Sequence, residues 1–188
     1  RTTMTSARGE VLAGGNMEPV VRVGDTVRRV AGPWTPAVHR LLRLHETAEI
    51  VETPRALGID AQGREALTFI PGEVMTTQPP ETLWSRELLR AAGRLLRRLH
   101  DASEPLVSAE LTWRQPRREP AEVVCHNDFA PYNLIVDGGR LVGVIDFGHA
   151  APGQPFVVME RLSGRPLSSV LKEHGALPWA QARDIAAQ

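Results

Sequence analysis

The stretch His126-Asn127-Asp128-Phe129-Ala130-Pro131-Tyr132-Asn133, followed by Ile145-Asp146-Phe147-Gly148, decides how this chain is interpreted. Asp128 lies between two apolar runs, residues 122–125 and 133–136, so we expect it in a loop held by two strands. A carboxylate in that position can orient and deprotonate an attacking hydroxyl. The motif therefore predicts a site for chemistry on nucleotide phosphates, which uses such a base together with metal ligands.

The metal ligands of this site are predicted from a hairpin. Asp137-Gly138-Gly139 is a tight-turn signal between the strands predicted at residues 134–136 and 141–145. The hairpin returns Asp146 to a position close to Asn133. An amide oxygen and a carboxylate, with positions left open for phosphate and water, suit Mg²⁺ better than Zn²⁺.

On these motifs the chain resembles the aminoglycoside phosphotransferase family, relatives of protein kinases and choline kinases. The resemblance implies an α+β, protein-kinase-like fold with two lobes: a small, mostly antiparallel N-terminal sheet with one helix, and a mainly helical C-terminal lobe. It implies that Asp128 is the catalytic base, that Asn133 and Asp146 hold Mg²⁺, and that His126 steadies the catalytic loop. The implied reaction is transfer of a phosphate from ATP to the hydroxyl of a small molecule. The alternative is a hydrophilic turn that contains these residues by chance.

Composition narrows the class of protein. The 188 residues contain 22 Lys and Arg against 22 Asp and Glu, which argues against a nucleic-acid or anionic membrane surface. The sequence shows no transmembrane stretch, and its first residues lack the apolar run of a signal peptide, so we expect a cytoplasmic protein. Cys125 is the single cysteine, and beside Val123 and Val124 it is expected to be a buried small hydrophobe. The oligomeric state is not predicted.

The first third of the chain predicts three short strands, from Val11, over residues 19–23 and over residues 26–30, with glycines at the bends. Gly14, Gly15 and Asn16 form a turn whose backbone amides can approach phosphate oxygens, because no Cβ intervenes at the glycines. Most Gly-Gly pairs are simple turns, so both interpretations stay open.

The cation expected on the third strand is Arg28 or Arg29. Strand alternation lets one of them face the cleft, and we favour Arg29. A helix is predicted from Thr35, with Thr35 as the capping hydroxyl and Pro36 at the first helical position. In the family, a Glu on this helix pairs with the basic residue. Here no acid lies between residues 35 and 44, and the best-matching position is His39.

That helix presents an apolar stripe of Val38, Leu41, Leu42 and His45. Two more strands are predicted over residues 54–60 and 64–70. The second resembles the family's hinge, whose backbone groups at Thr68, Phe69 and Ile70 would bind adenine; an ordinary strand end is the alternative.

A longer helix is predicted from about Thr82 to Asp101. Its core stripe follows helical spacing and consists of Trp84, Leu88, Ala92, Leu95 and Leu99, joined by Leu89 and Leu96. His100 at its end is expected to be a packed or capping histidine rather than a ligand.

The predicted organisation is an N-lobe at residues 1–74, a C-lobe core at 75–153 and a tail at 154–188. The tail resembles a kinase hinge strand and the two helices after it, although a hinge has already been assigned at residues 67–73. Three explanations are open: a composite chain that lost its acceptor region, a compact enzyme with replacement helices, or the start of a second kinase-like unit. The alternative functions are a catalytically incompetent nucleotide-binding module and, more distantly, a metal-dependent hydrolase with His126, Asp128 and Asp146 as ligands.

Overall fold

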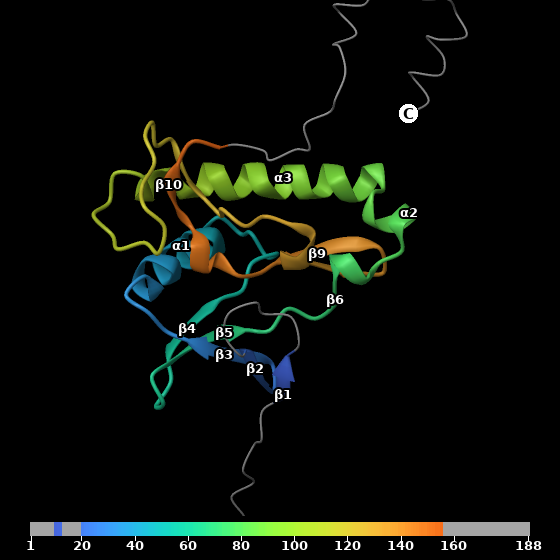
Figure 1. The fold of residues 1–188 in the computed structure, drawn as a ribbon, viewed down its shortest axis with the longest axis horizontal. Helices are drawn as coiled ribbons and strands as arrows, with labels where there is room; N and C mark the ends of the chain where they lie inside the picture. Colours follow the sequence, from blue (N-terminus) through green and yellow to red (C-terminus); the bar gives the residue numbers. More distant parts are fainter. Residues whose placement is uncertain (1–9, 13–19, 156–188) are drawn as a thin grey trace, which may run out of the picture. The chain divides into compact units, whose positions relative to one another are not determined.

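The N-terminal part of the chain is an antiparallel sheet of five strands in the order β1-β2-β3-β5-β4 (Figure 1). The computed structural model describes residues 10–12 and 20–155. The strands are β1 (Glu10–Leu12), β2 (Val20–Val23), β3 (Thr26–Val30), β4 (Ala56–Ile59) and β5 (Arg64–Thr68). The strands predicted in this part of the chain are confirmed, with β4 starting later than expected and β5 ending earlier.

Helix α1 (Thr35–Thr47) packs its predicted stripe into the core. Val38, Leu41, Leu42 and His45 are all at most 2% exposed. The predicted cap is wrong, because Thr35 lies inside the helix and its hydroxyl accepts a bond from Gly32 N at 3.0 Å. Trp34 precedes the helix without a side-chain cap, so Thr35 stabilises the turn before the helix instead.

The single helix predicted over residues 82–101 is two helices, α2 (Pro80–Leu83) and α3 (Arg86–Ser103). Ser85 is extended, and its hydroxyl accepts from Leu88 N at 3.3 Å, so it caps α3 and interrupts the predicted helix. Trp84 falls in this break and is 62% exposed, so its predicted place in the core is wrong. Leu88, Leu95 and Leu99 are buried as predicted, whereas Leu89 is 48% exposed, so its predicted place in the core is also wrong.

Two further antiparallel sheets lie in the C-terminal part. One has the order β6-β8-β9 and the other pairs β7 with β10. Their bounds are β6 (Glu73–Val74), β7 (Val123–Cys125), β8 (Leu134–Asp137), β9 (Arg140–Val144) and β10 (Ala151–Gly153). Gly138 and Gly139 connect β8 and β9 with φ of 54° and 73°, as a type I′ turn requires. The predicted hairpin is therefore confirmed.

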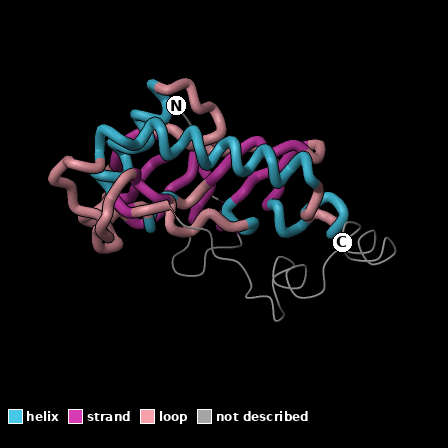
Figure 2. The backbone as a smooth tube through the Cα atoms, turned by 90° about the horizontal axis from the view of Figure 1, so that it is seen from above, coloured by secondary structure: helices cyan, strands magenta, loops and turns pink. Residues whose placement is uncertain are grey.

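Helix α3 lies over the strands in the view from above (Figure 2). It contacts helix α1 and strands β7 and β9. One apolar cluster joins these elements, with Val38 and Leu41 from α1, Leu95 from α3, Val136 from β8 and Val144 from β9. Cys125 is buried as predicted. The N-terminal and C-terminal parts of the described chain thus share one hydrophobic core.

The chain divides into two units, residues 1–155 and 156–188. The second unit lies outside the described residues, so the strand and helices predicted for the tail stay predictions, as do the lobe boundaries. Within residues 10–12 and 20–155, no helix has the length and apolarity needed to cross a membrane.

Candidate active site

The carboxylate of Asp128 is held from both sides in the loop between β7 and β8. Asn133 Nδ2 donates to Asp128 Oδ2 at 2.9 Å, and the Tyr132 hydroxyl donates to Oδ1 at 2.5 Å. The 3₁₀ turn Pro131–Asn133 supplies both donors. Since a carboxylate offers about four lone-pair positions, Asp128 retains capacity to accept a further hydroxyl.

Tyr132 was not among the predicted site residues. Its ring is 53% exposed, and its hydrogen bond to Asp128 raises the pKa of the phenol. Its place in the motif, four residues after Asp128 and next to Asn133, is the signal that could have found it.

His126 fastens the loop to the end of β9. The ring is buried, its Nδ1 accepts from Asp128 N at 3.2 Å, and its Nε2 faces Ile145 O at 2.9 Å. Burial lowers the pKa of His126 to about 4, so the ring is neutral near pH 7 and Nε2 carries the proton that it donates. Both ring nitrogens are engaged by backbone groups. His126 is thus not free to ligate a metal, which removes one ligand from the hydrolase alternative.

Asn133 and Asp146 are brought together by the hairpin. Ile145 N donates to Asn133 O at 2.9 Å, which places Asp146 next to the end of the Asp128 loop. Asn133 Nδ2 is committed to Asp128, so Asn133 Oδ1 is the amide atom that remains as an acceptor. Asp146 is in the left-handed region, with φ 60° and ψ 63°, and its side chain is 47% exposed.

The donor atoms of Asn133 and Asp146 fit Mg²⁺. Both residues offer oxygen, and Mg²⁺ is commonly held by one or two carboxylates plus substrate phosphates and water. Over the described residues, no group of three or more His, Cys, Asp or Glu side chains could hold a metal ion. A site made by the protein alone, such as structural zinc requires, is therefore not formed in this part of the chain.

Arg29 reaches this pair from the N-terminal sheet. Its Nη1 donates to Asp146 Oδ1 at 2.7 Å, and its Nε donates to Glu65. Burial by itself would lower the pKa of Arg29, but the charges and hydrogen bonds of Glu65 and Asp146 outweigh it, and the net change is upward. The guanidinium is thus a fixed positive charge beside Asp146.

Arg28 points elsewhere. Its Nη1 donates to Thr26 Oγ1 at 2.7 Å, and its Nε lies 3.4 Å from Asp60 Oδ2. Adjacent strand residues face opposite sides of a sheet, so the two arginines have separate partners.

Glu65 was also missed, whereas His39 was named in the sequence as the helix position that best matches the family's acid. Glu65 is 1% exposed, and its Oε1 lies 3.0 Å from His39 Nε2 of α1 without the angles of a hydrogen bond. The acid of α1 is Glu46, which lies 3.3 Å from Arg55 at the surface. The partner of Arg29, which the sequence did not provide on the helix, therefore comes from strand β5.

The hinge-like residues are partly committed to other bonds. Thr68 N donates to Arg55 O at 3.1 Å and Phe69 N to Asp25 O at 2.9 Å. For Ile70 N, no such bond is found among the described residues. The backbone N–H groups of Thr68 and Phe69 are thus already bonded, whereas that of Ile70 is available to bind a ligand. Gly14, Gly15 and Asn16 lie outside the described residues.

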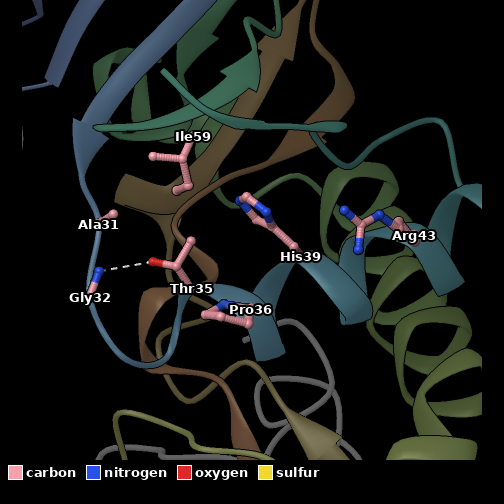
Figure 3. Close-up of a pocket in the computed structure, with 7 residues that line it drawn as sticks. All are labelled: Ala31, Gly32, Thr35, Pro36, His39, Arg43 and Ile59. Atoms are coloured by element: carbon pink, nitrogen blue, oxygen red, sulfur yellow. Dashed lines mark hydrogen bonds between the residues drawn. The ribbon is translucent and has the colours of Figure 1, made fainter. Parts of the chain in front are cut away.

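A pocket of about 400 Å³ opens beside the connection between β3 and α1 (Figure 3). None of the predicted site residues lines it. Its walls are Ala31, Gly32, Thr35, Pro36, His39, Arg43 and Ile59. Two lining residues are next to Glu65: His39 Nε2 lies 3.0 Å from its Oε1, and Ile59 is its partner in the pairing of β4 with β5.

Two comparisons place the chain among known sequences. The profile of the phosphotransferase enzyme family matches residues 9–118 and 106–157. A trifolitoxin immunity protein from Rhizobium leguminosarum bv. trifolii is 38% identical in a comparison 148 residues long, which covers 75% of this chain and 55% of that protein. The chain therefore spans about half the length of this curated relative.

Solved structures show the same fold. An aminoglycoside phosphotransferase from Streptomyces rimosus, in complex with ADP and streptomycin, has a TM-score of 0.54 at 16% identity, over 80% of this chain and 74% of that chain. A second structure of that enzyme has a TM-score of 0.50 at 19% identity, over 78% of this chain and 73% of that chain. The α+β fold predicted from the sequence is confirmed.

Proposed function

Because this chain belongs to the phosphotransferase enzyme family, we propose that it transfers the terminal phosphate of ATP to the hydroxyl of a small molecule. The observation that carries the proposal is the convergence of four side chains from three places in the sequence. Asn133 bonds the carboxylate of Asp128 at 2.9 Å, and Arg29 bonds that of Asp146 at 2.7 Å. Phosphate transfer requires this combination of base, metal ligands and cation.

Each residue has a distinct part in the proposed reaction. Asp128 binds the acceptor hydroxyl and receives its proton, while the acceptor oxygen forms a bond to the γ-phosphorus and the bond to the ADP oxygen breaks. Arg29 contacts the phosphates and balances their negative charge. His126 does not transfer a proton, because both its nitrogens hold the loop. Asn133 and Asp146 would hold Mg²⁺, which when bound neutralises charge on the phosphate oxygens.

The nucleotide is proposed to lie between the N-terminal sheet and the Asp128 loop. Gly14, Gly15 and Asn16 would cover its phosphates, and Ile70 N would bond the adenine. An ATP-dependent reaction of this kind is expected in the cytoplasm, where ATP is abundant.

The acceptor class is proposed from the relatives. The Streptomyces rimosus enzyme is described with streptomycin, which favours a polyhydroxylated antibiotic as the acceptor. The 38% identity to a trifolitoxin immunity protein favours a second candidate role, protection of the cell against a toxin. The two are compatible where the toxin itself carries the hydroxyl that is phosphorylated.

The test compares Asp128→Asn with wild type in a transfer assay with Mg·ATP and a panel of hydroxyl acceptors. Loss of a positioned base typically costs a factor of about 100 to 10,000 in rate, whereas nucleotide binding is expected to persist. Asp137→Asn is the matched control, since Asp137 is the exposed last residue of β8, beside the turn of the β8–β9 hairpin. Unchanged transfer by Asp128→Asn would remove Asp128 from the role of base.

A thermal shift with Mg·ATP separates this proposal from its rival, a module that binds nucleotide without transfer. Stabilisation of the protein with measurable transfer supports the enzyme. Stabilisation without transfer to any acceptor, or to water, supports the binding module. No stabilisation contradicts both.

A further inference from the structure

The buried Glu65 has no part in the reaction as proposed, yet it is bonded to the cation of the site. Its side chain is 1% exposed, and Arg29 is its hydrogen-bonded partner. Burying a carboxylate is costly unless it is paired, so the position of the arginine and that of the acid depend on each other.

Strand register places these two residues together. Arg29 of β3 and Glu65 of β5 are directly opposite in the antiparallel pairing. Side chains opposite each other in such a pair lie on the same face with their Cβ atoms about 5 Å apart. Their contact is therefore set by the sheet.

The guanidinium is held at two points in different parts of the fold. Nε bonds Glu65 within the N-terminal sheet, and Nη1 bonds Asp146 after β9 at 2.7 Å. Because the guanidinium is planar and rigid, fixing the Nε side fixes the direction of the other nitrogens. Glu65 thereby directs the free edge of Arg29 towards Asp146 and the proposed phosphate site.

Helix α1 contributes to this arrangement through His39, whose Nε2 lies 3.0 Å from the second oxygen of Glu65. Both oxygens of the carboxylate thus face a nitrogen, one from β3 and one from α1. Figure 3 shows His39 on the face of α1 below Ile59 of β4, at the wall of the pocket. The helix contacts the acid but does not provide it.

We propose that Glu65 is the positioning residue for Arg29, with His39 as its second contact, so that the phosphate-binding cation is oriented by strand register rather than by an acid on α1. This inference rests on the proposed function, because it assigns the phosphates to Arg29. It predicts that the cation is already in place before nucleotide binds, since a cross-strand pair does not depend on a movement of the helix.

The test measures binding of Mg·ADP and of adenosine by calorimetry, using the wild-type chain, Glu65→Gln, Arg29→Gln and the double variant. Glu65→Gln keeps the shape of the side chain and removes its charge. We expect it to weaken ADP binding about ten-fold and to leave adenosine binding unchanged, since a misdirected guanidinium affects only phosphates. A general folding defect would weaken both ligands.

Arg29→Gln is expected to cause the same loss, and the double variant no more than Arg29→Gln alone, because residues that act through one contact are not additive. If Glu65→Gln does not fold, the double variant leaves no unpaired buried charge. Its ADP affinity, compared with that of Arg29→Gln, then tests the inference. Arg28→Gln is the matched control, because Arg28 pairs with Asp60, and it is expected to bind ADP as wild type does.

Two results would overturn this inference without affecting the proposed function. One is an ADP affinity of Glu65→Gln equal to that of wild type. The other is a loss of ADP affinity in the double variant as large as the product of the two single losses. A wild-type chain that binds no ADP would instead overturn the proposed function, and this inference with it.

Discussion

His45 makes folding stability depend on pH in a way that can be calculated. The ring is 1% exposed, and neither ring nitrogen has a hydrogen-bond partner among the described residues. It lies against Phe147, with ring centroids 5.4 Å apart. Burial, and to a smaller degree the charge of His126, lower the pKa of His45 from 6.5 to about 4.

The direction of the effect follows from these two pKa values. The unfolded chain binds a proton on His45 more readily than the folded chain does. Stability is therefore retained above the unfolded pKa of 6.5 and is lost as the pH falls from 6.5 towards about 4. Between pH 7.5 and pH 5, a single group with this shift costs about 2 kcal/mol of unfolding free energy.

The perturbation is His45→Leu, and the assay is urea unfolding at pH 7.5 and pH 5. Wild type is expected to lose about 2 kcal/mol more than the variant over this interval. His126, with its pKa also lowered to about 4, is present in both chains, so it largely cancels in the difference. At pH 7.5 the variant should be at least as stable as wild type, because leucine removes two unpartnered buried nitrogens. Equal losses of stability in both chains would refute the reasoning.

Three further predictions follow from single contacts. Tyr132→Phe removes the hydrogen bond to Asp128 and should lower kcat about ten-fold with the ADP affinity unchanged; an unchanged kcat in the transfer assay would show that the bond is dispensable. Ser85→Ala removes the cap of α3 and should lower the unfolding free energy, measured in urea, by about 1 kcal/mol. An unchanged unfolding free energy would mean that the Ser85 cap does not stabilise the start of the helix. Gly72→Ala would place a Cβ 2.7 Å from Val136 O at a φ of 134°, so a loss of more than about 2 kcal/mol is expected. Gly63→Ala, with nothing within 4 Å of its Cβ, is its control in the same assay and should cost less.

Features of short range were predictable from the sequence. The β8–β9 hairpin follows from two glycines between apolar runs, and the buried stripe of α1 follows from helical spacing. Both depend on residues within a few positions of each other, where steric and hydrophobic preferences act directly.

Element boundaries were predicted less well. Thr35 and Trp84 were both assigned by local pattern, as a cap and as a core residue. The first lies inside α1, and the second lies in the break before α3. At each position two local structures compete. The Thr35 hydroxyl could cap the helix or bond the turn before it, and Ser85 could cap a new helix or lie within one continuous helix. The hydrogen bonds that form in the folded chain decide between them.

The sequence by itself predicted the kind of chemistry that we propose, because the Asp128 motif and the Asp146 segment each contain the residues that predict their loop and hairpin. The sequence favoured Arg29 as the cation, but only the tertiary structure showed that Glu65 and Asp146 are its partners. Arg29, Glu65 and Asp146 are far apart in the chain. Arg29 meets Glu65 because β3 pairs with β5 in one register, and it meets Asp146 because the β8–β9 hairpin ends next to it. A shift of that register by one residue would turn Glu65 to the opposite face. The contacts of Arg29 with Glu65 and Asp146 depend on the whole fold, so no local sequence pattern predicts them.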